Sequence, residues 1–147
     1  MRYWEDFHVG DVTELGPVMV TEDEIVEFAT RFDPQPFHVD AEAARESPFG
    51  GLIASGWHTA AIYMGMFVRG VLQGTASLGS PGVEELRWTA PVRPGDTLRG
   101  RATITDVAPS STNLGRGTIF GSHEVINQDG VVVMRFTSRG FIARRPT

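Results

Sequence analysis

A carboxylate and an imidazole stand five positions apart in the stretch Phe32-Asp-Pro-Gln-Pro-Phe-His38. Each proline fixes its own φ and disfavours the α region for the residue before it, so we expect Asp33 and Gln35 to be extended and the preceding helix to stop. The stretch is then a stiff loop in which Phe32 and Phe37 supply apolar walls. Asp33 and His38 in partly dry surroundings would form an acid/base pair tuned towards neutral pH.

A structural interpretation of the same stretch also stands. Asp-Pro after a helix is a common turn signal, and a single histidine in a loop is usually a surface residue. The spacing of Asp33 and His38 alone does not decide between a turn and a catalytic pair.

Two helices must position this stretch. Thr21 to Glu24 has the pattern of a capping box, and Ile25, Phe28, Ala29 and Phe32 follow at the spacing of one helical face. Asp33 then lies at the carboxyl end of that helix, where the helix dipole would raise the pKa of the carboxyl group. Asp40 is placed to cap a second, short helix over 41–46.

The segment 57–72 is the longest apolar element, with only His58, Thr59 and Arg69 strongly polar. We expect a helix that is enclosed on most sides and lies at the centre of the fold. Ser55 is a candidate N-cap, and the free amides that begin at Gly56 would form a site for an anion or a carbonyl oxygen. Ser55 and Gly56 are equally consistent with a cap that only begins a core helix.

From residue 82 onward the pattern changes to strands. β-branched, aromatic and alternating apolar residues predict strands over 82–90, 97–107, 118–127 and 131–143, in addition to an interrupted strand over 11–20. Arg93-Pro-Gly-Asp96 predicts a type II turn, and Asn127-Gln-Asp-Gly130 predicts a tight hairpin. The order of elements predicts a single α+β domain over 1–147, in which an antiparallel sheet wraps around a long central helix.

Composition excludes several classes of function. The chain of 147 residues has 13 basic residues, all arginine, against 18 acidic ones and a net charge of −5, which argues against a nucleic-acid or membrane partner. Zero cysteines exclude a disulfide framework and thiolate chemistry. The amino terminus lacks the apolar core of a signal peptide, and no run is long enough to span a membrane. We therefore expect a soluble, cytoplasmic protein.

Four motifs together resemble the MaoC-like dehydratases, the group of the R-specific enoyl-CoA hydratases. They are Glu5-Asp-Phe7 with Gly10-Asp11, the Asp33/His38 block, Ile53-Ala-Ser-Gly56 and Ala90-Pro-Val-Arg-Pro-Gly-Asp96. The resemblance implies a hot-dog fold, a homodimer with sites near the subunit interface, and an acyl-CoA substrate. The implied reaction is the reversible addition of water to a trans-2-enoyl thioester.

Carried over by position, Asp33 and His38 would hold the catalytic water, and the Gly56 amide would bind the thioester carbonyl. We expect Gln35, Phe37, Ser55 and Trp57 to contact the substrate. Three positions depart from the family pattern: Phe32 replaces a glycine, Gln35 replaces an asparagine, and Ser55 replaces the histidine before Gly56. These changes bear on substrate choice. The reaction needs no cofactor, and the histidine spacing offers no metal site.

Two other functions use the same residues. A hot-dog thioesterase would direct the carboxylate and a water at the thioester bond, and a non-catalytic module would bind acyl-CoA without turnover. We interpret His58 as a packed or interface residue, and His8 and His123 as structural or surface residues.

Arginines gather in sequence around the turn at 93–96. They either face the phosphates of CoA or form a solvated strand face paired with acids. The residues in question are Arg87, Arg93, Arg99, Arg101 and Arg116.

Overall fold

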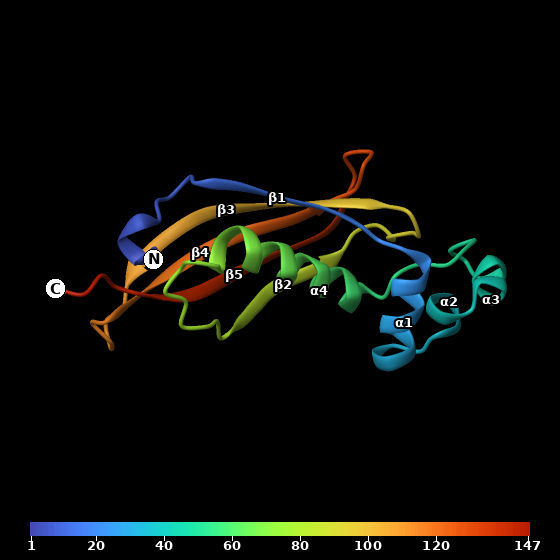
Figure 1. The fold of residues 1–147 in the computed structure, drawn as a ribbon, viewed down its shortest axis with the longest axis horizontal. Helices are drawn as coiled ribbons and strands as arrows, with labels where there is room; N and C mark the ends of the chain where they lie inside the picture. The colour runs from blue at the N-terminus through green and yellow to red at the C-terminus, as the bar shows by residue number, and fades with distance from the viewer.

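The computed structural model describes residues 1–147 as a curved antiparallel sheet crossed by one long helix (Figure 1). Its five strands lie in the order β1-β3-β4-β5-β2. Three short helices gather at one end of the sheet, and both chain termini lie at the other end (Figure 1). The elements are η1 (Trp4–Asp6), β1 (Val12–Met19), α1 (Glu22–Phe32), α2 (Pro36–Val39), α3 (Ala41–Glu46), α4 (Gly56–Phe67), η2 (Val68–Leu72), β2 (Gly82–Trp88), β3 (Thr97–Pro109), β4 (Arg116–Ile126) and β5 (Val132–Ala143).

The α+β class and all five strands predicted from the sequence are confirmed. Strand bounds agree with the predictions to within two residues, because the residue pattern and the turn residues both mark the strand ends. At the turn before β3, Gly95 has a φ of +88° and Asp96 donates its N–H to the Arg93 carbonyl at 3.1 Å, as a type II turn requires. The β4–β5 hairpin closes through Gly130, whose N–H bonds the Asn127 carbonyl at 3.1 Å.

The core lies between the sheet and α4. Alternate residues of β4 point to this side, and Gly121, His123 and Val125 are buried there. Met134 of β5 pairs with Val125, and both Met134 and Leu98 of β3 are almost fully enclosed. The sheet therefore presents an apolar surface on which the helix can lie.

The long helix is α4 continued by the π-helical turn η2, 17 residues in all. The expectation that it is enclosed on most sides is wrong for the single chain. One face is buried against the sheet, while Trp57, Met64 and Val68 remain 58%, 50% and 40% exposed. One five-stranded sheet can cover only one side of a helix, so the other side stays open. None of the helices is both long and apolar enough to cross a membrane.

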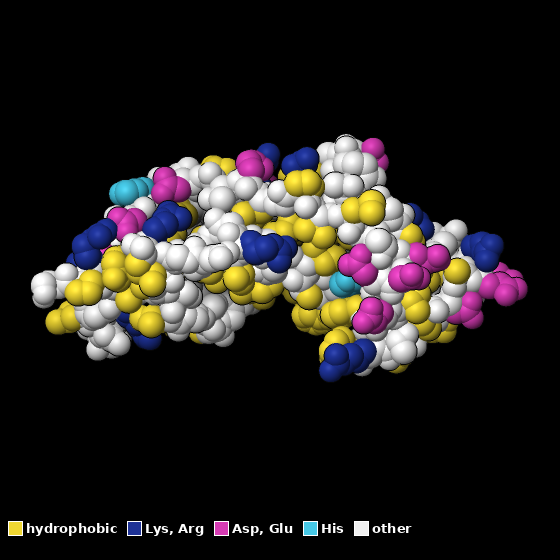
Figure 2. All heavy atoms as spheres, in the orientation of Figure 1, with side chains coloured by type: hydrophobic (Ala, Val, Ile, Leu, Met, Phe, Trp, Pro, Cys, Tyr) yellow, Lys and Arg dark blue, Asp and Glu magenta, His cyan; other side chains and the backbone are white.

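The surface carries its charge unevenly. In the view of Figure 2, acidic side chains crowd the end formed by α1–α3, and hydrophobic side chains form a band across the centre of the molecule. α1 alone begins with three acidic residues in its first turn.

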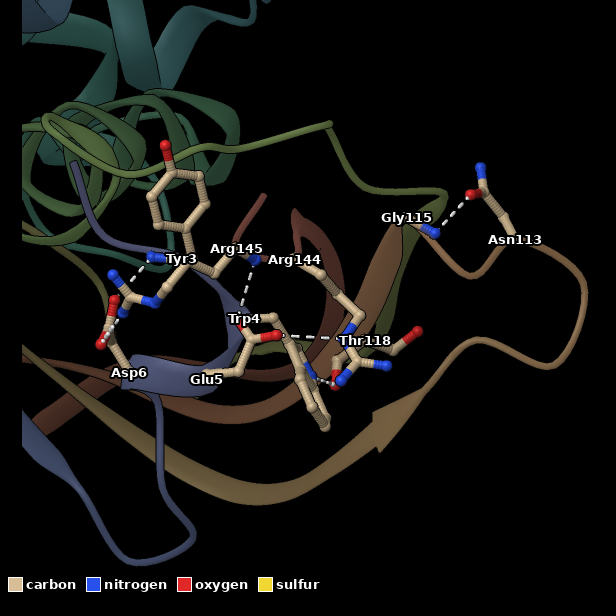
Figure 3. A network of polar contacts seen from close by, with 9 residues as sticks. All are labelled: Tyr3, Trp4, Glu5, Asp6, Asn113, Gly115, Thr118, Arg144 and Arg145. Carbon is tan, nitrogen blue, oxygen red and sulfur yellow. Dashed lines mark hydrogen bonds and ion pairs between the residues drawn. The ribbon is translucent and has the colours of Figure 1, made fainter. Parts of the chain in front are cut away.

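At the end opposite α1–α3, the amino- and carboxyl-terminal segments are joined by a polar network (Figure 3). Glu5 accepts hydrogen bonds from Nε of Arg144 at 3.1 Å and from the backbone N–H of Arg145 at 3.0 Å. Asp6 accepts from Nη2 of Arg145 at 2.6 Å. These contacts hold η1 against the end of β5.

Candidate active site

The prolines position Asp33 and His38 with two differences from the prediction: Asp33 is not extended, at φ −158° and ψ 68°, and His38 does not lie in a loop. α1 ends at Phe32, and Asp33 caps it through its N–H, which bonds the Ala29 carbonyl at 2.8 Å. Gln35 is extended, at φ −77° and ψ 146°. The loop predicted at His38 is wrong, because Pro36 begins the one-turn helix α2, a position where its fixed φ is favourable.

His38 and Asp33 form a close pair. Nε2 of His38 lies 3.3 Å from Oδ2 of Asp33, and the His38 side chain is almost fully buried while that of Asp33 is 19% exposed. Nδ1 of His38 lies 2.7 Å from the carbonyl oxygen of Ile53. A carbonyl only accepts, so Nδ1 carries a proton and Nε2 is the nitrogen left to exchange one with Asp33 or a bound water.

Both oxygens of the Asp33 carboxylate are held by donors. Ser55 Oγ donates to Oδ2 at 2.7 Å, and Gln35 Nε2 donates to Oδ1 at 2.8 Å. Ser55 also accepts from the N–H of Trp57 at 3.3 Å and thereby caps α4, as predicted. Ser55 and Gln35, both expected to contact the substrate, thus contact the same carboxylate.

The pKa of Asp33 is lowered, which corrects the expectation from the helix dipole. Burial raises this pKa, but the hydrogen bonds from Ser55 and Gln35, together with the charge and hydrogen bond of His38, lower it by more. Direct donors at less than 3 Å act on the ionised form more strongly than the end of a three-turn helix. Asp33 is therefore ionised at neutral pH.

Gly56 begins α4 beside Ser55. Its N–H makes no hydrogen bond within the chain. A Cβ at this position would overlap the indole of Trp88, which donates Nε1–H to the Gly56 carbonyl at 2.8 Å. Glycine is therefore required here for close packing as well as for access to the amide. Trp57 is exposed and meets Trp88 edge-on, with ring centroids 5.0 Å apart.

Of the two predicted aromatic walls, only one lies against the pair. Phe37 meets the His38 ring edge-on at 4.5 Å and Phe49 at 5.1 Å. Phe32 is 60% exposed and contacts Phe28 on its own helix, so its predicted role as a wall is wrong within this chain. Helix periodicity placed Phe32 on the apolar face, but the last turn of α1 extends past the core.

The other histidines lie apart from the pair. His58 is packed, as predicted: its ring stacks on Phe28 at 4.7 Å, and burial lowers its pKa despite the charge of Glu24. His8 is at the surface. His123 was interpreted as a structural or a surface residue. It is buried in the sheet, so it is not a surface residue.

Two contacts of the site were not predicted from the sequence. Ser55 was expected to cap the helix and to contact the substrate, but not to donate to Asp33, and Trp88 was not expected at the site at all. A serine before a helix-starting glycine is a signal that could have suggested a second partner for the hydroxyl. Nothing in the local sequence connects Trp88 with Gly56, 32 positions away.

The arginines around the turn at 93–96 have separate roles. Arg93 donates Nη2–H to the carbonyl of Phe49 at 2.6 Å, and the Phe49 ring contacts Phe37. Arg101 pairs with Glu14 at 2.7 Å, as the interpretation of a solvated strand face expects. Arg116 lies over the ring of Phe141. Of these three, Arg93 is the one nearest the candidate site.

Comparison with known proteins gives a consistent result. The family model described as "MaoC like domain" matches residues 7–122. An uncharacterized protein of Bacillus subtilis, YdeM, is 32% identical over 115 residues, covering 78% of this chain and 82% of that protein. The (R)-specific enoyl-CoA hydratase of Rhodospirillum rubrum is 33% identical over 114 residues, or 74% of each chain.

Solved structures extend the similarity to the whole fold. The MaoC-like dehydratase from Rhodospirillum rubrum is 43% identical and superposes with a TM-score of 0.92 over 100% of both chains. The R-hydratase PhaJ1 from Pseudomonas aeruginosa is 26% identical, with a TM-score of 0.79 over 98% of this chain and 86% of that one. The architecture of sheet and central helix is thus that of the hot-dog structures.

Proposed function

Because the chain belongs to the MaoC-like dehydratase family, we propose that it catalyses the reversible addition of water to a trans-2-enoyl thioester, giving a 3-hydroxyacyl thioester. The observation that carries the proposal is the pair formed by ionised Asp33 and His38, 3.3 Å apart beside the unbonded amide of Gly56. Hydration needs a base for water, an acid for the α carbon and a donor for the thioester oxygen, and these three groups meet that need.

In this proposal each group has one step. Asp33 accepts a proton from water as the water oxygen bonds to C3. His38, protonated on Nε2, gives a proton to C2, and the proton taken up by Asp33 returns to His38 across the hydrogen-bonded pair. The bond from Nδ1 to Ile53 keeps the imidazole in the required orientation. Gly56 N–H stabilises the charge that develops on the thioester oxygen, a contact worth about 10²–10³ in rate in other enzymes.

Four further residues are proposed to contact the substrate. Phe37 lies against His38, and exposed Trp57 follows Gly56, so both border the place where the acyl group would lie. Gln35 and Ser55 hold the carboxylate and are close enough to shape the pocket around C2 and C3.

We also propose that the working form is a homodimer that binds acyl-CoA. Trp57, Ala61, Met64 and Val68 form an exposed stripe along α4, and the edge strand β2 has no neighbour on its outer side. A second copy of the chain would cover both the apolar stripe and the unpaired strand edge. Sedimentation at micromolar concentration should give a dimer, and a stable monomer of 16.1 kDa contradicts this part of the proposal.

The activity is tested with a panel of short, medium, branched and aromatic trans-2-enoyl-CoA substrates. Hydration removes the absorbance of the conjugated double bond and leaves the thioester intact. A thioesterase would release free thiol without that loss, and a binding module would show saturable binding without turnover of any substrate. The proposal predicts loss of the enoyl absorbance with at least one chain length.

A further inference from the structure

Trp88, at the end of β2, holds the carbonyl side of Gly56. Its indole Nε1–H donates to the Gly56 carbonyl oxygen at 2.8 Å. The ring also fills the space beside the Cα of Gly56, where a Cβ would overlap the Cε2 and Cδ2 atoms of the indole. One side chain thus fixes this glycine both by a hydrogen bond and by packing.

The residue before Gly56 is fixed as well. Ser55 is fully buried, and its hydroxyl donates to Oδ2 of Asp33 at 2.7 Å and accepts from the N–H of Trp57 at 3.3 Å. The Ser55–Gly56 peptide, which carries the unbonded Gly56 N–H, therefore lies between two anchored groups. Glycine has more backbone freedom than any other residue, so an anchor on each side restricts the direction of this N–H.

A β-bulge in β2 sets the direction of Trp88. Val83 of β2 pairs with Ser138 of β5, and five positions later Trp88 pairs with Met134. Positions 134 and 138 are four apart on one strand and share a face of the sheet, so Val83 and Trp88 share that face too. Residues five apart in a regular strand would point to opposite faces. The change is made at 85–86, where two residues of β2 lie opposite one residue of β5.

The bulge contains a residue that does not favour its own backbone conformation. Glu85 has a φ of +55°, and no other non-glycine residue of the chain has a positive φ. A bulge whose first residue is left-handed usually has glycine there, because a side chain is strained in that region. Strain of this kind persists where the surrounding structure requires it, and it is concentrated at functional sites. The strained residue lies three positions before Trp88, in the bulge that turns the indole towards α4.

We propose that Trp88 is a positioning residue for the hydration reaction, acting through the Gly56 amide. This inference rests on the proposed function, in which that amide binds the thioester oxygen. A donor stabilises a developing charge best when its direction is fixed before the reaction, because no reorganisation is then needed. Trp88 fixes the direction from β2, a strand that holds none of the other candidate site residues.

Nitrogen-15 relaxation of the Gly56 amide, measured on the whole chain without substrate, tests this role directly. Trp88→Phe keeps an aromatic ring and removes the Nε1–H donor. We expect the order parameter of the Gly56 N–H to fall from that of a rigid backbone, about 0.85, towards that of a flexible one, about 0.6. The measurement needs no turnover, so it does not depend on finding the right substrate.

Trp4→Phe is the matched control. Trp4 also donates its indole N–H to a carbonyl, that of Thr118 at 3.1 Å, and it also packs on a glycine, Gly117. It lies at the other end of the sheet, with the chain termini (Figure 3). Trp4→Phe should therefore leave the order parameter of the Gly56 N–H unchanged.

Steady-state kinetics with an enoyl-CoA give a second readout. Loss of a whole oxyanion donor costs about 10²–10³ in rate, and a donor that is only less well directed should cost less. We therefore expect kcat of Trp88→Phe to fall by about 10-fold, with KM changed by less than about 3-fold. Trp4→Phe should keep kcat. A residue that serves only stability would lower Tm and leave kcat per folded enzyme unchanged.

Two substitutions at Glu85 test the bulge. Glu85→Val disfavours the left-handed conformation, because the side chain is β-branched, and should reduce both kcat and the Gly56 order parameter as Trp88→Phe does. Glycine adopts a positive φ without strain, so Glu85→Gly should retain both values.

The outcomes separate this inference from the proposed function. If wild type hydrates enoyl-CoA, an unchanged Gly56 order parameter or an unchanged kcat in Trp88→Phe overturns the inference and leaves the function standing. Equal losses of kcat in Trp88→Phe and Trp4→Phe also overturn it, because they would reflect a general loss of packing. If wild type hydrates no enoyl-CoA, both the function and the role of Trp88 in it are overturned.

Discussion

Two histidines of this chain, His38 and His123, are equally buried, each 4% exposed. They differ in their hydrogen-bond partners, because only His38 lies next to a charged group. His38 lies between a backbone carbonyl and the carboxylate of Asp33. His123 lies between two hydroxyl groups, in a ring of aromatic side chains. Burial alone therefore does not determine what an imidazole can do. An ionised carboxylate can exchange a proton with the imidazole, whereas two hydroxyl partners keep the imidazole in one uncharged form.

The same contrast extends to the surroundings of each histidine. Near His38, Asp33 keeps a lowered pKa because Ser55 and Gln35 donate to it despite burial. Near His123, no carboxylate offsets burial, and its pKa falls to about 4. The first region can support proton transfer at neutral pH, and the second region is suited to neutral hydrogen bonding.

The largest expected effect concerns the charged pair. His38→Ala should lower kcat/KM for enoyl-CoA hydration by about 10²–10⁴, the usual contribution of a positioned acid or base. The double variant with Asp33→Asn should be scarcely worse than the poorer single variant, since groups that act on one water are strongly non-additive. Steady-state kinetics of the two single variants and the double variant measure this. If the double variant loses the product of the two single losses in kcat/KM, Asp33 and His38 do not share a step.

The burial of His38 adds a stability effect that the sequence did not suggest. His38→Ala removes the donor to the Ile53 carbonyl, so we expect unfolding to be easier by about 1–3 kcal/mol. Asp33 is partly exposed, and Asp33→Asn should unfold close to wild type. Denaturant melts of both variants separate the loss of chemistry from the loss of structure.

The next prediction concerns the pH dependence of stability and His123. A histidine with a lowered pKa binds a proton in the unfolded chain before the folded one, so stability is lost as pH falls from about 6.5 to about 4. The loss attributable to this residue is on the order of 3 kcal/mol. His123→Gln should remove that part of the pH dependence, whereas His8→Gln, at the surface, should retain it. Identical slopes for His123→Gln and wild type contradict the assignment.

A smaller effect is expected at Ser55. Ser55→Ala removes a donor that lowers the pKa of Asp33, so the acid limb of the kcat/KM profile should move to higher pH, with activity about 3- to 10-fold lower at neutral pH. Loss of the helix cap should cost about 1 kcal/mol of stability. Ser110→Ala, in the exposed loop before β4, is the control. An unchanged acid limb in Ser55→Ala would mean that another group sets it.

The smallest effect is expected at Gln35. Gln35→Asn shortens the amide that reaches Oδ1 of Asp33 and restores the residue usual in the family. Activity should be kept within a few-fold, and the order of preference among enoyl-CoA chain lengths should change. Measuring kcat/KM over the same substrate panel detects the change. A uniform loss on all substrates would assign Gln35 to positioning of the carboxylate instead of substrate choice.

Most of the fold could be predicted from sequence because its signals are local. Period-two patterns, the Pro-Gly turn before β3 and the cap at Thr21 each lie within a few residues. The openness of α4 could not be predicted, because an all-apolar helix looks the same whether its own sheet or another copy covers it. Phe32 was misplaced for a similar reason, since periodicity does not show where the core ends.

The candidate site was likewise predictable only in part. Asp33, His38 and Gly56 were identified from proline placement, helix capping and family resemblance, and the structure brings them together around Ser55. The direction of the Asp33 pKa was predicted wrongly, because it depends on donors from Ser55, 22 positions away. The hydrogen bonds of His123 have no sequence signal, since Tyr63, His123 and Ser138 come from three separate elements.

The most direct test of the account is hydration of a trans-2-enoyl-CoA by wild type and by Asp33→Asn, followed by the absorbance of the conjugated double bond. Asparagine keeps the shape of the side chain and removes only its charge. We expect hydration by wild type, a loss of about 10²–10⁴ in turnover for Asp33→Asn, and little change in Tm. Full hydration by Asp33→Asn would contradict it, as would brisk thioester hydrolysis by wild type without hydration of any enoyl-CoA.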